Sequence, residues 1–226
     1  MPATRTARER ARAELVQEIK DEARRQLAEV GAHGLSLRAV ARALGMVSSA
    51  LYRYFPSRDQ LLTELIVDAY DAIGEAAEQA DRPDEEPRHR WQLIWHAVRA
   101  WALKHPHEYA LIYGSPIPGY QAPQDTVVPA SRVVFALGRV LESAALRPAS
   151  EGQGRSAALR RQTDDLAVRL ESRLTGAELT RLLMAWSQLF GALNFELFGQ
   201  FRGSVDPSDE FFTYTAQQMA DFVGLR

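Results

Sequence analysis

Cysteine is absent from the 226-residue chain, and its absence excludes two kinds of site. Without thiols the fold cannot depend on disulfide bonds, and no metal ion can be held by thiolate ligands. A chain without cysteine also tolerates a reducing compartment.

Long hydrophobic runs are absent as well. No apolar stretch approaches the roughly 18 residues that a membrane-spanning helix needs. The first twelve residues are rich in arginine, but no apolar segment follows them, so they do not resemble a secretory signal. With 46% hydrophobic and 25% charged residues, the composition is that of an ordinary globular domain. We expect a cytoplasmic protein.

Catalytic patterns are missing too. The sequence shows no triplet of nucleophile, base and orienting group, and no glycine-rich phosphate loop. His105, His107 and Glu108 invite a metal site, but a proline separates the two histidines, and capping or surface roles explain them better. The sequence therefore predicts no metal ion, no cofactor and no enzymatic activity.

Charge is distributed unevenly along the chain, although the net charge is only −2. Residues 1–60 carry 11 Arg/Lys against 7 Asp/Glu, whereas the remaining 166 residues carry 16 against 22. A basic head on an acidic body suits a protein that presents one end to phosphates. An excess of four charges also arises by chance, so DNA binding needs the support of a sequence motif.

Hydrophobic spacing predicts an all-α fold of about nine helices, with no strand-like alternation and no internal repeat. A capping pattern at 57–60 predicts the start of a long helix that ends near residue 80. We assign 1–56 to a DNA-binding domain and 57–226 to a body for ligand binding and dimerisation. The polar segment 147–165 is expected to be a loop, disordered in part.

Residues 36–55 have the pattern of a helix-turn-helix. Two short helical segments meet at Gly45, where glycine can adopt a positive φ without a Cβ clash. Small residues at 48–50 keep the second segment thin enough to enter a major groove about 12 Å wide. Tyr52, Tyr54 and Arg58 follow it, and their hydroxyl and guanidinium groups can hold phosphates.

The predicted DNA-contacting residues are Ser36, Arg38, Val47, Ser48, Ser49, Ala50, Tyr52, Tyr54 and Arg58. Each also has a purely structural explanation. The two tyrosines could be packing aromatics, the arginines could be solvated surface residues, and Ser36 could be a helix cap.

The sequence resembles the TetR family of regulators over about residues 8–65. The resemblance is carried by Leu37-x-x-Val40-Ala41-x-x-Leu44-Gly45-Met46 and by Ala50-Leu51-Tyr52-x-Tyr54-Phe55-Pro56-Ser57-Arg58-x-x-Leu61-Leu62. Val47 departs from the family, which often has serine there as the cap of the recognition helix. The loss of that cap costs about 1 kcal/mol.

The rest of the chain, over about 90–200, resembles a C-terminal domain of the same family that is named for a Trp-His-Gly signature. The resemblance is carried by Pro106-His107-Glu108-Tyr109, Gly114-x-Pro116-x-Pro118-Gly119-Tyr120 and Trp186-x-x-x-Phe190-Gly191. Phe190 stands where the signature has histidine, so a polar role at that position does not carry over. The resemblance implies an effector pocket among these helices.

Large aromatic side chains concentrate in the helices that the resemblance assigns to the pocket. The candidate ligand-binding residues are Trp95, Tyr109, Tyr113, Phe135, Trp186, Phe190 and Asn194. Each could equally be an ordinary core residue. Asn194 stands out because an amide in an apolar helix needs a hydrogen-bonding partner. No counter-ion is evident among these residues, so the ligand should be uncharged and mainly apolar.

Together these features predict a sequence-specific DNA-binding regulator that forms a homodimer on an inverted-repeat operator. The resemblance implies a repressor released by a small apolar or amphipathic ligand. Two alternatives stay open: an effector-independent architectural DNA-binding protein, and an all-helical enzyme acting on a lipid-like substrate.

Overall fold

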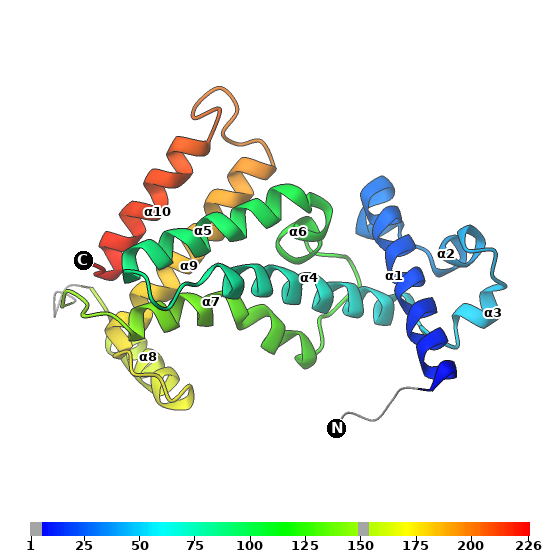
Figure 1. Cartoon of the computed structure of the whole chain (residues 1–226), viewed down its shortest axis with the longest axis horizontal. Helices are drawn as coiled ribbons and strands as arrows, with labels where there is room; N and C mark the ends of the chain where they lie inside the picture. Colours follow the sequence, from blue (N-terminus) through cyan, green and yellow to red (C-terminus); the bar gives the residue numbers. More distant parts are fainter. Residues whose placement is uncertain (1–5, 149–153) are drawn as a thin grey trace. The chain divides into compact units, whose positions relative to one another are not determined.

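The structure is a computed structural model that describes residues 6–148 and 154–226, and this part of the chain contains helices and no strand (Figure 1). The predicted all-α class is confirmed. About nine helices were expected, and the described residues form ten α-helices and one short 3-10 helix. They are α1 (Ala7–Gly34), α2 (Leu37–Ala43), α3 (Ser48–Leu51), α4 (Arg58–Ala80), α5 (Pro87–Lys104), α6 (Pro106–Tyr113), η1 (Gln124–Thr126), α7 (Val127–Glu142), α8 (Ala157–Arg169), α9 (Gly176–Leu197) and α10 (Asp209–Val223).

The helices group into two compact units, which we call the head and the body. The head comprises the chain up to Tyr70 together with His105–Val127, and the body comprises Asp71–Lys104 together with Val128–Arg226. Helix α4 thus contributes its first part to the head and its second part to the body. Helix α6 belongs to the head, although it follows α5 of the body in the chain.

The core of the head is apolar and nearly free of solvent. Its largest fully buried side chains include Ile19 of α1, Leu51 of α3 and Leu61 of α4. Partly buried residues from the segment His105–Val127, such as Ile117 and Tyr120, pack against this core. Because burying apolar surface is the main favourable term in folding, this distant segment stabilises the head.

Local signals set the helix boundaries in the head. At the start of α1, Thr6 and Glu9 form a reciprocal capping box. Gly31 has φ +67 inside the last turn of α1, a conformation that favours glycine and interrupts the helix near its end. Before α4 begins, the Ser57 hydroxyl accepts a hydrogen bond of 3.1 Å from the Gln60 backbone N–H, which confirms the predicted start.

In the body, α5 packs against both α9 and α10, and α8 packs against α9. The buried Trp91 indole of α5 donates a hydrogen bond of 3.1 Å to the Ala216 carbonyl of α10. Arg99 of α5 pairs with Glu196 of α9 at 2.6 Å and with Asp209 of α10 at 3.1 Å. These contacts fix three helices of the body to one another.

Part of the predicted polar loop is a helix. Residues 157–165 lie in α8, whereas 149–153 fall outside the described residues. The Ser156 hydroxyl accepts a hydrogen bond of 3.2 Å from the Leu159 backbone N–H and so caps the helix. Packing against α9 then stabilises the helix in spite of the polarity of the segment. None of the helices described is long and apolar enough to cross a membrane.

Candidate nucleic-acid interface

The turn between α2 and α3 is built on one glycine. Gly45 has φ +66, and a Cβ added there would meet nothing within 4 Å. The backbone conformation, and not lack of space, therefore favours glycine at this position. Hydrogen bonds from the Gly45 N–H to the Arg42 carbonyl at 3.1 Å and from the Met46 N–H to the Ala41 carbonyl at 2.8 Å close the turn.

Helix α3 is short and anchored from one side. Leu51 and Phe55 are 0% and 3% exposed, so they hold the helix and the following turn against the head core. Ser49, Tyr52 and Arg53 are exposed on the opposite side. A helix anchored in this way presents a free face that can enter a major groove.

The start of α3 lacks a side-chain cap. Val47 occupies the N-cap position with φ −71 and ψ 138, and its side chain makes no capping hydrogen bond. The valine is 70% exposed. Ser36 occupies the N-cap position of α2, again without a side-chain capping hydrogen bond, so its hydroxyl is not committed to that role.

The two predicted tyrosines have different surroundings. Tyr52 is 42% exposed, whereas Tyr54 is partly buried against the head core. The Arg12 guanidinium lies 5.2 Å from the centre of the Tyr54 ring, within the range of a cation–π contact. Tyr54 therefore has a packing role in the head, and Tyr52 is the more accessible of the two.

Arg58 links the start of α4 to the end of α1. Its guanidinium donates to the Leu35 carbonyl at 3.1 Å and to the Ala32 carbonyl at 2.6 Å. These bonds satisfy carbonyls that a helix end leaves without intrahelical partners. The predicted contact of Arg58 with phosphate stays a prediction.

Sequence reasoning missed Arg53, which is exposed directly after Tyr52. The predicted Arg38 is also exposed, on α2, and so is its neighbour Arg42. Arg53 could have been found from the sequence, because it is a basic residue in the turn that follows the second short helix.

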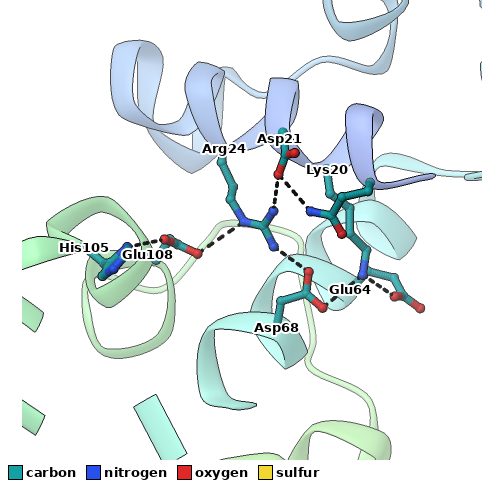
Figure 2. A network of polar contacts seen from close by, with 8 residues as sticks. Lys20, Asp21, Arg24, Glu64, Asp68, His105 and Glu108 are labelled. Atoms are coloured by element: carbon teal, nitrogen blue, oxygen red, sulfur yellow. Dashed lines mark hydrogen bonds and ion pairs between the residues drawn. The ribbon is translucent and has the colours of Figure 1, made fainter. Parts of the chain in front are cut away.

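A network of charged side chains ties three helices of the head together (Figure 2). Arg24 of α1 is at its centre, with Asp68 of α4 at 2.6 Å and Glu108 of α6 at 3.2 Å. Lys20 of α1 also pairs with Asp68, at 3.0 Å, and His105 Nδ1 lies 2.9 Å from Glu108. The network therefore attaches α6 to the helix that supports α2 and α3.

Two predicted ligand-binding residues lie on α6 in the head. Tyr109 is fully buried, and its ring centre lies 5.4 Å from that of Tyr113. Tyr70 of α4 meets Tyr113 edge-on at 5.8 Å. Burial raises the pKa of both α6 tyrosines well above its usual value, so their hydroxyls stay protonated in ordinary buffers.

The other predicted ligand-binding residues lie in the body. Trp95 is fully buried, and its ring centre lies 5.8 Å from those of Trp91 and Phe212. On α9, Trp186 and Phe190 meet edge-on at 5.8 Å. Phe135 and Asn194 complete the set: Phe135 is 42% exposed and Asn194 is partly buried.

Two short helices at a tight glycine turn, with a free face next to basic side chains, define a DNA-binding regulator of the helix-turn-helix class. Residues 19–65 match the family model described as "Bacterial regulatory proteins, tetR family", and residues 91–219 match "Tetracyclin repressor-like, C-terminal domain". The chain belongs to the TetR family of transcriptional regulators, as the resemblance predicts.

Relatives of known sequence and structure agree. The HTH-type transcriptional regulators Rv1816 of Mycobacterium tuberculosis and Mb1846 of Mycobacterium bovis are each 40% identical over 208 residues, which cover 84% of this chain and 84% of each relative. The crystal structure of a protein described as a regulatory protein, SCO4313, has a TM-score of 0.80 and 35% identity, covering 96% of this chain and 100% of that one.

More distant structures share the fold. A TetR family transcription regulator from Marinobacter aquaeolei VT8 has a TM-score of 0.59 and 17% identity, covering 93% of this chain and 96% of that one. A protein of unknown function from Rhodococcus sp. RHA1 has a TM-score of 0.67 and 21% identity over the full length of both. The Trp-His-Gly subtype of the C-terminal domain stays a prediction.

Proposed function

We propose that this TetR family regulator is a repressor that binds an inverted-repeat operator as a homodimer and is released by a small, uncharged, mainly apolar effector. The observation that carries the proposal is the exposed face of α3, held in place by the buried Leu51 and Phe55. One such face reads only a half-site, so two heads related by a two-fold axis suit an inverted repeat. Its place of action is then the cytoplasm, where bacterial DNA lies.

The proposed DNA contacts keep the predicted set, with Arg53 added. Val47, Ser48, Ser49 and Ala50 would face base edges, because they form the start of α3. Ser36, Arg38, Tyr52, Tyr54 and Arg58 would hold phosphates on either side. Contacts to phosphate position the protein, whereas contacts to base edges provide sequence specificity.

Homodimerisation is supported by apolar side chains that the single chain leaves exposed on the helices of the body. Met184 and Phe195 of α9 are 55% and 52% exposed, and Tyr214 of α10 is 59% exposed. Leu189 of α9, in contrast, is already buried within its own chain. Exposed apolar surface on the helices of a folded body marks a candidate protein–protein interface.

We place the coupling between effector and DNA in α6. This helix carries two proposed ligand contacts, Tyr109 and Tyr113, and also Glu108, whose carboxylate pairs with Arg24 of α1 (Figure 2). An effector that displaces α6 would move α1 through this ion pair and thereby shift α2 and α3. Linkage then requires that DNA weakens effector binding by the same factor.

No enzymatic activity is proposed, because a regulator of this kind needs only differential affinity for its two ligands. The effector should be released chemically unaltered. Recovery of a modified compound after incubation with the protein would contradict this part of the proposal.

A gel-shift titration with the DNA that flanks the protein's own gene tests the proposal. We expect a specific complex that dissociates when a compound selected by thermal shift is added. Glu108→Gln should keep DNA affinity but reduce release by the compound, whereas Glu64→Gln is the matched control. Glu64 pairs with Lys20 at 3.0 Å in the same network but makes no bond to α6 among the described residues.

Three outcomes of that experiment carry information. Absence of any specific complex contradicts DNA-binding repression at this site. A complex that no stabilising compound releases supports an effector-independent architectural protein. Equal release in Glu108→Gln and in the wild type contradicts coupling through α6.

A further inference from the structure

Trp91 and Trp95, on consecutive turns of α5, differ in the hydrogen bonding of their indole nitrogens. Both Trp91 and Trp95 are fully buried, and the Trp91 indole N–H donates to the Ala216 carbonyl at 3.1 Å. The Trp95 indole nitrogen is buried and has no hydrogen-bonding partner in the described chain. The indole nitrogen of Trp186, on α9, is a second donor of this kind.

An indole N–H can only donate a hydrogen bond. Buried donors in proteins are paired in the great majority of cases, because leaving one unpaired forfeits its hydration without replacement. The ring centres of Trp91 and Phe212 each lie 5.8 Å from that of Trp95, and burying an N–H beside such rings needs a reason other than packing. A phenylalanine would fill much of the same space without the cost.

The charge around Trp95 favours a neutral partner for this donor. Arg99, four residues after Trp95 on α5, is held by Glu196 and Asp209, so its charge is already balanced. An anionic group placed beside Trp95 would be buried without a free counter-ion, which is expensive. An uncharged oxygen acceptor meets the need of the N–H without that cost.

We propose that the effector carries an uncharged acceptor oxygen, as in a ketone, ester or ether, and that this oxygen accepts a hydrogen bond from Trp95 Nε1. The inference rests on the proposed function, since it describes the effector of the proposed repressor. It goes beyond an apolar, uncharged ligand because it names the polar group and the donor that recognises it. Trp95 is then a specificity residue that distinguishes a carbonyl compound from the hydrocarbon of the same shape.

Pairs of probes that differ only in a carbonyl and a methylene group test the inference. Suitable pairs are benzophenone with diphenylmethane, acetophenone with ethylbenzene, and 2-nonanone with nonane. The dissociation constants of each pair are measured by calorimetry or fluorescence for the wild type, for Trp95→Phe and for Trp91→Phe. Trp91→Phe is the matched control, because it removes the same group one turn away on the same helix.

The quantity to compare is the ratio of the two dissociation constants within a pair, because a general loss of stability affects both members alike. For at least one pair, the preference for the ketone should fall about tenfold in Trp95→Phe, which corresponds to one hydrogen bond. It should persist in Trp91→Phe. In protein with 15N-labelled tryptophan, the ketone should shift the Trp95 indole resonance and leave the Trp91 resonance in place.

The inference is overturned if the ratio is the same in Trp95→Phe and in the wild type for every pair, or if no ketone binds at all. It is also overturned if Trp91→Phe changes the ratio as much as Trp95→Phe, because the effect would then be one of packing. These measurements need no DNA. If the protein binds ketones through Trp95 but forms no complex in the gel shift, the proposed repressor function is contradicted. The proposed ligand site at Trp95 would still stand.

Discussion

At the scale of single residues, Tyr52 is the cleanest test of the interface with DNA. Its side chain is 42% exposed, so Tyr52→Phe should leave the free energy of unfolding unchanged. Loss of one hydroxyl contact to phosphate should weaken operator binding roughly threefold to tenfold. Ser204→Ala, which removes an exposed hydroxyl of the body, is the control in the same gel shift. Unchanged affinity in Tyr52→Phe would remove Tyr52 from the interface.

Val47 offers a prediction of increased stability. The valine stands at the N-cap of α3 without a side-chain capping bond. Val47→Ser supplies a hydroxyl that can accept from a backbone N–H of the first turn and should raise stability by about 1 kcal/mol. A urea titration followed by circular dichroism measures the change. A variant no more stable than the wild type would mean that the fold of the head, and not the cap, sets the stability of α3.

The hydrogen-bonding partners of Arg58 could not be predicted from the sequence. Its position after the second tyrosine indicated a phosphate contact, but its guanidinium is occupied by two carbonyls from the end of α1. Sequence spacing identifies the residue type and the helix. It cannot show that a helix end more than twenty residues earlier offers acceptors to the same side chain.

At the scale of helices, most boundaries follow from local chemistry. The glycine turn at Gly45 and the cap at Ser57 were predictable because each acts on its immediate neighbours. Helix α8 was not predicted over 157–165, because its polar composition resembles a loop. Its stability depends on packing against α9, which the sequence does not display.

A buried ion pair holds the start of the body together. Arg90 of α5 and Asp81, which follows α4, are 2.7 Å apart, with side chains only 6% and 10% exposed. Arg90 also donates to the Ser143 hydroxyl at 2.8 Å. Asp81→Asn leaves a buried cation without its partner and should lower stability by about 3 kcal/mol.

Denaturation by urea measures this loss. Asp84→Asn is the matched control, because Asp84 is exposed in the same linking segment. A loss in Asp81→Asn no greater than that in Asp84→Asn would show that solvent compensates the arginine.

His96 of α5 makes stability depend on pH. Burial, and secondly the nearby Arg99, lower its pKa below the ordinary value of 6.5. The unfolded chain therefore binds a proton at a higher pH than the folded chain, so this histidine reduces stability as the pH falls below about 6.5. In His96→Gln, the melting temperature should fall less between pH 7 and pH 5.5 than in the wild type. The exposed His89 on the same helix, replaced by glutamine, is the control. Parallel curves for His96→Gln and the wild type would contradict this prediction.

At the scale of the whole molecule, the sequence predicted the helix-turn-helix and the all-α class but not the composition of the head. Residues of His105–Val127 pack against a core built mainly from the first 65 residues. The Thr63 and Tyr120 hydroxyls, 57 positions apart in the chain, lie 2.9 Å from each other. Contacts at such separation leave no local pattern, so only the structure shows that α6 belongs to the head.

Assembly gives a prediction at the scale of the whole molecule. Exposed apolar side chains on α9 and α10 predict a homodimer that persists at micromolar concentration. Sedimentation velocity measures it, and Met184→Glu together with Phe195→Glu should shift the protein to monomer without loss of helix content. A wild-type monomer at that concentration would contradict a dimeric reader of an inverted repeat.

The most direct test of the central claim is a hydroxyl-radical footprint of the protein on the DNA that flanks its own gene. If two α3 faces of a homodimer read an inverted repeat, two protected segments should appear, related by a two-fold axis and separated by about one or more helical turns of 10–10.5 base pairs. Tyr52→Phe should weaken both segments equally. A single protected segment, or uniform protection without symmetry, would contradict the account.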